Sequence, residues 1–160
     1  MKFVILDRDG TINHDSDQYI KSPEEWKPIK GSMEAIARLT QAGYRLVVAT
    51  NQSGIARGLF DMTTLNAIHD AMHRAVVQAG GRIDAIFFCP HAADSECDCR
   101  KPKPGMLLEI GRRSGSISGT RSRSTTSRIC FRLWYFALKR DSNFLQTILS
   151  TIRRKVDRRK

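Results

Sequence analysis

Short apolar runs alternate along this chain with longer segments in which apolar residues recur every three or four positions. The short runs are rich in Val, Ile, Leu and Phe, which is typical of strands that are buried on both faces. The longer segments have the spacing of amphipathic helices, and alternating strands and helices predict an α/β protein with a parallel sheet. The predicted strands are residues 3–6, 44–49 and 83–88, and the predicted helices are residues 33–43, 63–79 and 106–113.

The first predicted strand ends at two carboxylates, Asp7 and Asp9, and Gly10 follows them. In open α/β sheets the ligand crevice lies beyond the carboxyl ends of the strands, so both acids are expected to project into it. Two carboxylates this close repel one another unless a cation lies between them or one keeps a proton. Mg²⁺ suits such a pair, because it binds one or two carboxylates together with water and phosphate oxygens. The alternative is an Asp-x-Asp turn on the surface.

The second predicted strand ends in hydroxyl and amide groups, and Arg57 follows them. Neutral donors around one cation are what the oxygens of a phosphate need, although the same residues also suit a plain turn. The connection after the first strand is about twenty residues long, which favours a functional role over filler. The strand-end groups are Thr50, Asn51, Gln52 and Ser53, and the polar residues of the connection are Asp15, Asp17, Gln18 and Tyr19.

Four soft metal ligands follow the third predicted strand: Cys89, His91, Cys97 and Cys99. They complete a tetrahedral set for Zn²⁺ and leave no position for water, so the predicted site is structural. Free thiols are the alternative, and the short spacings differ from those of a zinc finger.

Basic residues follow the last of these ligands, at positions 100–103. A lysine among them is a candidate to stabilise a phosphate, and a solvated basic turn is the alternative. His69 and His73 lie four residues apart on the second predicted helix, where we predict a solvated face in preference to a metal site.

Composition and charge bear mainly on the end of the chain. The 160 residues suffice for one domain, and no stretch is long enough to span a bilayer. The start lacks the basic region, apolar run and small-residue cleavage site of a secretory signal, so we expect a cytoplasmic protein. The net charge of +11 is uneven: residues 1–113 hold 15 basic and 14 acidic side chains, whereas residues 114–160 hold 12 and 2. The excess charge is therefore a property of the last segment.

Taken together, residues 7–11, residues 50–54, the Cys/His loop and residues 99–102 resemble the haloacid dehalogenase-like phosphatases. The resemblance covers residues 1–113 and implies a Rossmann-like parallel sheet without a cap domain. Within the family, the motifs are most similar to those of phosphatases that act on D-glycero-D-manno-heptose bisphosphate, which belong to lipopolysaccharide heptose biosynthesis. Histidinol-phosphate phosphatases share them, and polynucleotide 3′-phosphatases do so less closely.

The resemblance implies an Mg²⁺-dependent phosphomonoester hydrolase that works through an aspartyl-phosphate. Asp7 would attack phosphorus, and Asp9 would protonate the leaving sugar oxygen and later activate water. Both acids would bind Mg²⁺, while Thr50 and Lys101 would stabilise the transferring phosphoryl group. The expected partner is a small sugar phosphate, and the expected state is a monomer. Contacts with substrate are implied for Asp15, Asn51, Gln52, Ser53 and Arg100, and structural zinc for Cys89, His91, Cys97 and Cys99.

Residues 114–160 depart from the family pattern, which has a further buried strand ending in Gly-Asp with another acid shortly after. Fourteen of the fifteen residues from 114 to 128 are Ser, Thr, Gly or Arg, a composition unable to form a core alone. Residues 129–138 could form a strand, and Asp141 is the one candidate for the missing acid. Without that motif Mg²⁺ loses a carboxylate, which weakens the expectation of activity in this chain.

Two hypotheses address this segment. It is either sequence from a shifted reading frame or a fusion, or a basic binder of nucleic acid or anionic membranes. The second reading depends on aromatic residues at 131–136 and on the basic run at 153–160. We do not expect nucleic-acid binding from residues 1–113.

Overall fold

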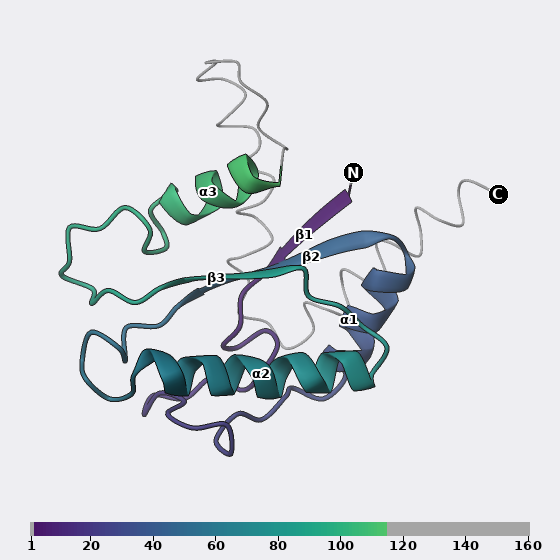
Figure 1. The fold of residues 1–160 in the computed structure, drawn as a ribbon, viewed down its shortest axis with the longest axis horizontal. Coiled ribbons are helices and arrows are strands. Elements are labelled where there is room, and N and C mark those ends of the chain that lie inside the picture. Colours follow the sequence, from purple (N-terminus) through teal and green to yellow (C-terminus); the bar gives the residue numbers. More distant parts are fainter. Residues whose placement is uncertain (1, 115–160) are drawn as a thin grey trace.

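The computed structural model of the protein describes residues 2–114, which form a parallel three-stranded sheet with helices on both faces (Figure 1). The α/β class predicted from the sequence is confirmed, and every predicted element starts and ends within two residues of its predicted bounds. The strands are β1 (Lys2–Leu6), β2 (Tyr44–Asn51) and β3 (Ala85–Cys89), in the spatial order β1-β2-β3. The helices are α1 (Ser32–Gln41), α2 (Met62–Gln78) and α3 (Gly105–Arg113).

The sheet separates two hydrophobic cores, because successive side chains of a strand point to opposite faces. Val4 and Leu6 of β1 pack on one face with side chains from α1 and α2. Ile5 packs on the other face with Met106 and Ile110 of α3. Figure 1 shows the same arrangement, with α1 and α2 on one side of the sheet and α3 on the other. Residues 3–6 therefore read as a continuous apolar run because both of their faces are covered.

The long connection between β1 and α1 is anchored in the larger core. Ile12, Ile20 and Trp26 are all buried there, at 0%, 4% and 7% exposure. The backbone N–H of Ile29 also donates to the carbonyl of Ile12 at 3.0 Å. Although this connection has no helix or strand of its own, its apolar side chains hold it against the strand ends.

The register of the sheet brings the polar strand ends together at one edge. Leu6 of β1 pairs with Val48 of β2, and Asn51 of β2 pairs with Cys89 of β3. All pairs are parallel, so the residues that follow each strand emerge on the same side. The acids after β1, the polar end of β2 and the Cys/His loop after β3 are therefore neighbours.

Several sequence predictions lie outside the described residues. They concern the basic segment from residue 115 onward, the strand at 129–138 and the candidate acid Asp141. Within residues 2–114, no helix is both long and apolar enough to cross a bilayer.

Candidate active site

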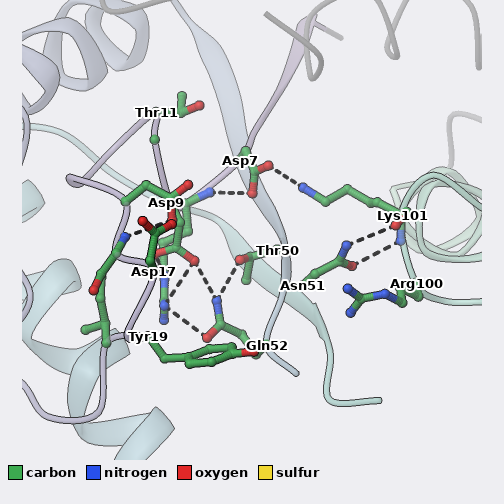
Figure 2. Close-up of a pocket in the computed structure, with 15 residues that line it drawn as sticks. Asp7, Asp9, Thr11, Asp17, Tyr19, Thr50, Asn51, Gln52, Arg100 and Lys101 are labelled. Atoms are coloured by element: carbon green, nitrogen blue, oxygen red, sulfur yellow. Dashed lines mark hydrogen bonds and ion pairs between the residues drawn. The ribbon is translucent and has the colours of Figure 1, made fainter. Parts of the chain in front are cut away.

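A cavity of about 530 Å³ opens at the carboxyl ends of β1 and β2 (Figure 2). Its walls come from the β1 end, the connection that follows, the β2 end and the basic residues after the Cys/His loop. Of the predicted catalytic and substrate residues, only Ser53 is absent from this wall. The predicted residues that line the cavity are Asp7, Asp9, Asp15, Thr50, Asn51, Gln52, Arg100 and Lys101.

Asp7 and Lys101 form an ion pair inside the cavity. Lys101 Nζ lies 2.5 Å from Asp7 Oδ2, and the two side chains are 15% and 27% exposed. The other oxygen of Asp7, Oδ1, accepts the backbone N–H of Arg8 at 2.9 Å. Burial raises the pKa of Asp7 above its ordinary value, and the attraction of Lys101 offsets only part of that effect. A cation beside Asp7 would therefore favour its ionised, nucleophilic form.

Asn51 holds the backbone of Lys101 in place. Its side-chain amide donates to the carbonyl of Lys101 and accepts from the N–H of the same residue, both at 3.0 Å. This two-point contact joins the end of β2 to the basic segment, as Figure 2 shows. Asn51, predicted to contact substrate, therefore also positions the lysine that faces Asp7.

The carboxylate of Asp9 is held by donors on both of its oxygens. Arg8 Nε and Asn13 Nδ2 donate to Oδ1 at 3.0 and 2.9 Å, and Arg8 Nη2 and Gln52 Nε2 donate to Oδ2 at 3.2 and 2.9 Å. Gln52 Nε2 also donates to Thr50 Oγ1 at 2.8 Å. Because an ionised carboxylate has about four acceptor positions, these bonds use the capacity of Asp9 in full.

These donor sets bear on the predicted Mg²⁺ site. Asp7 retains acceptor capacity beside the cavity, and Asp15 and Asp17 add oxygen donors to the wall, which is the ligand chemistry that Mg²⁺ prefers. Asp7 therefore fits the ion. The side chain of Asp9 is occupied by nitrogen donors, and its role as a magnesium ligand stays a prediction.

The Cys/His loop brings its predicted ligands into one cluster. The ligand atoms of Cys89, His91, Cys97 and Cys99 all lie within 4.8 Å of one another. Cys89 Sγ lies 3.7 Å from Cys97 Sγ and 3.5 Å from His91 Nδ1, which lies 3.3 Å from Cys99 Sγ. Ideal tetrahedral bond lengths to zinc place two sulfurs about 3.8 Å apart and sulfur and nitrogen about 3.6 Å apart. The cluster thus fits a structural Zn²⁺.

Crowding of the thiols supports the same reading. Burial raises the pKa of Cys99 to about 12, and the neighbouring thiols of Cys89 and Cys97 add to the effect, whereas hydrogen bonds outweigh burial at Cys97 and lower its pKa. Neighbouring thiolates would repel one another, and a bound dication would offset that repulsion and hold the sulfurs as thiolates. The backbone of the loop is also tied to α3, since the N–H of Gly105 donates to the carbonyl of Asp98 at 3.1 Å. A Cβ at position 105 would collide with that carbonyl, so this contact requires glycine.

The prediction of a solvated face for both histidines of α2 is wrong for His69. His73 is exposed, whereas His69 is only 8% exposed and its Nε2 lies 3.5 Å from Arg8 Nη1. Position 69 flanks the apolar stripe made by Leu65, Ile68 and Met72 on the same helix. Helical periodicity places it beside the buried face, but its contacts with Arg8 and Phe88 are shown only by the tertiary structure.

Sequence reasoning also missed the roles of Arg8 and Asn13. The side chain of Arg8 is 1% exposed and Asn13 is fully buried, yet both donate to Asp9. Arg8 lies between the two acids of the motif, where a basic residue reads as an ordinary turn residue. Buried arginines are usually paired with a carboxylate, so the burial of Arg8 would have pointed to Asp9 as its partner. The sequence alone does not show that Arg8 is buried.

Burial of His69 predicts an acid-sensitive stability. Its pKa falls from 6.5 to about 4 because burial, and next the positive charge of Arg8, disfavour the charged ring. As the pH falls below 6.5 the unfolded chain takes up a proton that the folded chain refuses, so the free energy of unfolding decreases. The expected loss from this one group is about 1.4 kcal/mol between pH 7.5 and 5.5.

Urea unfolding at the two pH values, on the full chain and on His69→Gln, measures this contribution as a difference between the two proteins. Acid effects on the Cys/His cluster are common to both and cancel. An equal pH dependence in the two proteins would contradict the prediction.

Comparisons with known proteins agree with this geometry. The family described as polynucleotide kinase 3 phosphatase matches residues 2–128. The chain belongs to the haloacid dehalogenase-like phosphatases. The match continues past residue 113, where the resemblance found in the sequence ends, so the boundary of the phosphatase core stays a prediction.

Relatives within this phosphatase family are closely similar. The D-glycero-beta-D-manno-heptose-1,7-bisphosphate 7-phosphatase of Bordetella bronchiseptica is 65% identical over 113 residues, which are 71% of this chain and 63% of that protein. The protein of the same name from Pseudomonas aeruginosa is 58% identical over 117 residues, which cover 72% of this chain and 66% of the relative. The chain thus spans slightly less than two thirds of these relatives.

A solved structure of this phosphatase family shares the fold. The D,D-heptose 1,7-bisphosphate phosphatase from B. bronchiseptica, complexed with magnesium and phosphate, superposes with a TM-score of 0.71 at 63% identity. The matched region covers 72% of this chain and 64% of that one. The family assignment made from the motifs is confirmed by sequence and by fold.

Proposed function

We propose that this chain hydrolyses D-glycero-β-D-manno-heptose 1,7-bisphosphate to the 1-phosphate through an aspartyl-phosphate on Asp7. The observation that carries the proposal is the pairing of Asp7 with Lys101 at 2.5 Å in a cavity lined by acids and phosphate-binding donors. The identity of the substrate is taken from the name of the relatives that are 58–65% identical over this region. The expected cytoplasmic location and monomeric state stay predictions.

Five residues of the cavity wall have a defined task in this reaction. Asp7 attacks phosphorus, and its half-buried carboxylate forms a bond to phosphorus as the bond to the sugar oxygen breaks. Asp9 donates a proton to that oxygen and then removes one from the water that cleaves the aspartyl-phosphate, for which one of its four nitrogen donors, such as Gln52 Nε2, must give way. Lys101, Thr50 and Arg100 surround the phosphoryl oxygens with positive charge and a hydroxyl group. These steps return Asp7 unchanged and release inorganic phosphate.

Mg²⁺, when bound beside Asp7, supplies the charge that lets an anionic nucleophile approach an anionic phosphate. Asp7 is the residue of this cavity best suited to hold it, with the oxygens of the neighbouring wall available for further contacts. Zn²⁺ in the Cys/His cluster would hold the loop that carries Arg100 and Lys101.

The function is tested by phosphate release from the full chain with Mg²⁺ and Zn²⁺. Heptose 1,7-bisphosphate is the expected substrate, and histidinol phosphate and a 3′-phosphorylated oligonucleotide serve as comparisons. We expect turnover of the heptose at a rate at least tenfold above either comparison, with one phosphate retained in the product.

A loss-of-function variant for this assay is Lys101→Met, which keeps most of the length of the side chain without its charge. Removing one such stabilising charge is expected to reduce kcat by about 10²–10³-fold. A folded, zinc-loaded sample that releases no phosphate from any of the three substrates would refute the proposed function.

A further inference from the structure

A chain of contacts runs from α2 to the carboxylate of Asp9. His69 Nε2 lies 3.5 Å from Arg8 Nη1. Arg8 in turn meets both oxygens of Asp9, with Nε 3.0 Å from Oδ1 and Nη2 3.2 Å from Oδ2. A guanidinium that meets both oxygens sets the plane of a carboxylate as well as its position. The orientation of Asp9 therefore depends on the orientation of the Arg8 guanidinium.

The guanidinium of Arg8 is itself held from several sides. Its side chain is 1% exposed, so its N–H groups need partners within the protein. Asp9 meets one edge of the group, Gln52 Oε1 accepts from Nη2 at 3.0 Å, and His69 faces Nη1. Asp9 and Gln52 thus contact Nε and Nη2, and His69 is the contact at Nη1.

His69 suits this task because it is both fixed and neutral. Its ring is buried, and its centroid lies 6.1 Å from that of Phe88 on β3, with the planes tilted by 60°. Burial and the neighbouring charge of Arg8 lower the pKa of His69 to about 4, so the ring is uncharged at neutral pH. An uncharged imidazole that carries its proton on Nδ1 presents a lone pair on Nε2 to the arginine.

We infer that His69 is a positioning residue, which holds the Arg8 guanidinium so that Asp9 is presented correctly for proton transfer. The inference rests on the proposed function, in which Asp9 is the acid and base. His69 acts through Arg8 and does not line the cavity, so its loss should affect the chemical step more than substrate binding.

Two substitutions separate positioning from packing. His69→Gln offers an acceptor to Arg8 Nη1, whereas His69→Met fills similar space with only a weak thioether acceptor. His73→Met is the matched control, because it is the same change at an exposed histidine one turn further along α2.

With the full chain loaded with Zn²⁺ and Mg²⁺, we expect His69→Met to lower kcat by about tenfold or more, since small misplacements of catalytic groups are costly. KM for the bisphosphate should stay within about twofold of the original value, as expected when only the transition state is affected. His69→Gln should recover kcat to within about threefold, and His73→Met should leave it unchanged. Equal kcat in the Gln and Met variants would overturn the inference. So would losses of kcat that are explained entirely by lower melting temperatures of the variants.

A second measurement reads the position of Arg8 without turnover. In ¹⁵N NMR spectra of the full chain, a restrained guanidinium gives separate, slowly exchanging Nη1 and Nη2 signals. The signals of Arg8 are identified as those that are missing from the spectrum of Arg8→Lys. We expect these signals in the original chain and in His69→Gln, and their merging in His69→Met. If they are unchanged in His69→Met, the positioning role is refuted. If no variant releases phosphate but the signals behave as expected, the contact chain stands and the proposed function fails.

Discussion

Asp7→Asn is expected to abolish phosphate release, with kcat reduced by at least about 10³-fold, because the amide is a far weaker nucleophile than the carboxylate. The substitution keeps the shape of the side chain. It removes the negative charge that faces Lys101 Nζ at 2.5 Å. Since burial already disfavours the charge on Asp7, the free energy of unfolding should change by less than about 1 kcal/mol.

The measurement is phosphate release at saturating heptose bisphosphate, with thermal unfolding of the same samples. Asp70→Asn is the matched control, because it makes the same change at an exposed position of α2. Asp7→Asn with more than a tenth of the original kcat would show that Asp7 is not the nucleophile.

The same chemistry predicts where the phosphoryl group resides. If Asp9 activates the hydrolytic water, Asp9→Asn should slow hydrolysis of the aspartyl-phosphate, so that the adduct accumulates. Acid quenching followed by mass spectrometry should then find the phosphoryl mass on the peptide that contains residue 7. The adduct should be absent from the double variant Asp7→Asn/Asp9→Asn, and its presence on any other peptide would contradict the mechanism.

If the Cys/His cluster holds the predicted zinc, its removal is expected to have the second large effect. Residues 89–105 bind few apolar partners of their own, and the cluster stands between β3 and the segment that carries Lys101. Structural zinc sites in small peptides contribute about 10–16 kcal/mol of apparent binding energy, which here would hold the loop rather than the whole fold. Without the ion, Lys101 should lose its position opposite Asp7, and kcat should fall by about 10²-fold or more.

Cys97→Ser/Cys99→Ser tests this without a chelator, and dialysis against EDTA followed by Mg²⁺ tests it on the original chain. Zinc content, thermal unfolding and phosphate release are measured on the same samples. Ser95→Ala is a control within the loop that spares every predicted ligand. An apo-protein with unchanged kcat and an unchanged unfolding temperature would show that the cluster has no structural role.

Much of the site was predictable because its groups are close in sequence or follow strand ends. The ligands Cys89, His91, Cys97 and Cys99 lie within eleven residues, so a single loop brings them together whatever the rest of the fold. Asp7 and Thr50 were placed by a general property of parallel sheets, in which successive strands end at the same edge. These inferences need only local spacing and strand direction.

The amino-acid sequence by itself determined the α/β class, the edge of the sheet that bears the cavity, and the composition of the Cys/His cluster. The tertiary structure alone decided that Arg8 and His69 are buried. It also decided that Arg8 donates to both oxygens of Asp9 and that Asn51 holds the backbone of Lys101. The contacts of His69 with Arg8 and of Asn51 with Lys101 join residues from separate elements, 61 and 50 positions apart. Arg8 and Asp9 are adjacent in sequence, and there it is the burial of Arg8 that the sequence does not show. Periodicity can show which face of α2 is apolar, but the partner of a residue at the margin of that face depends on how the helix packs against the end of β1.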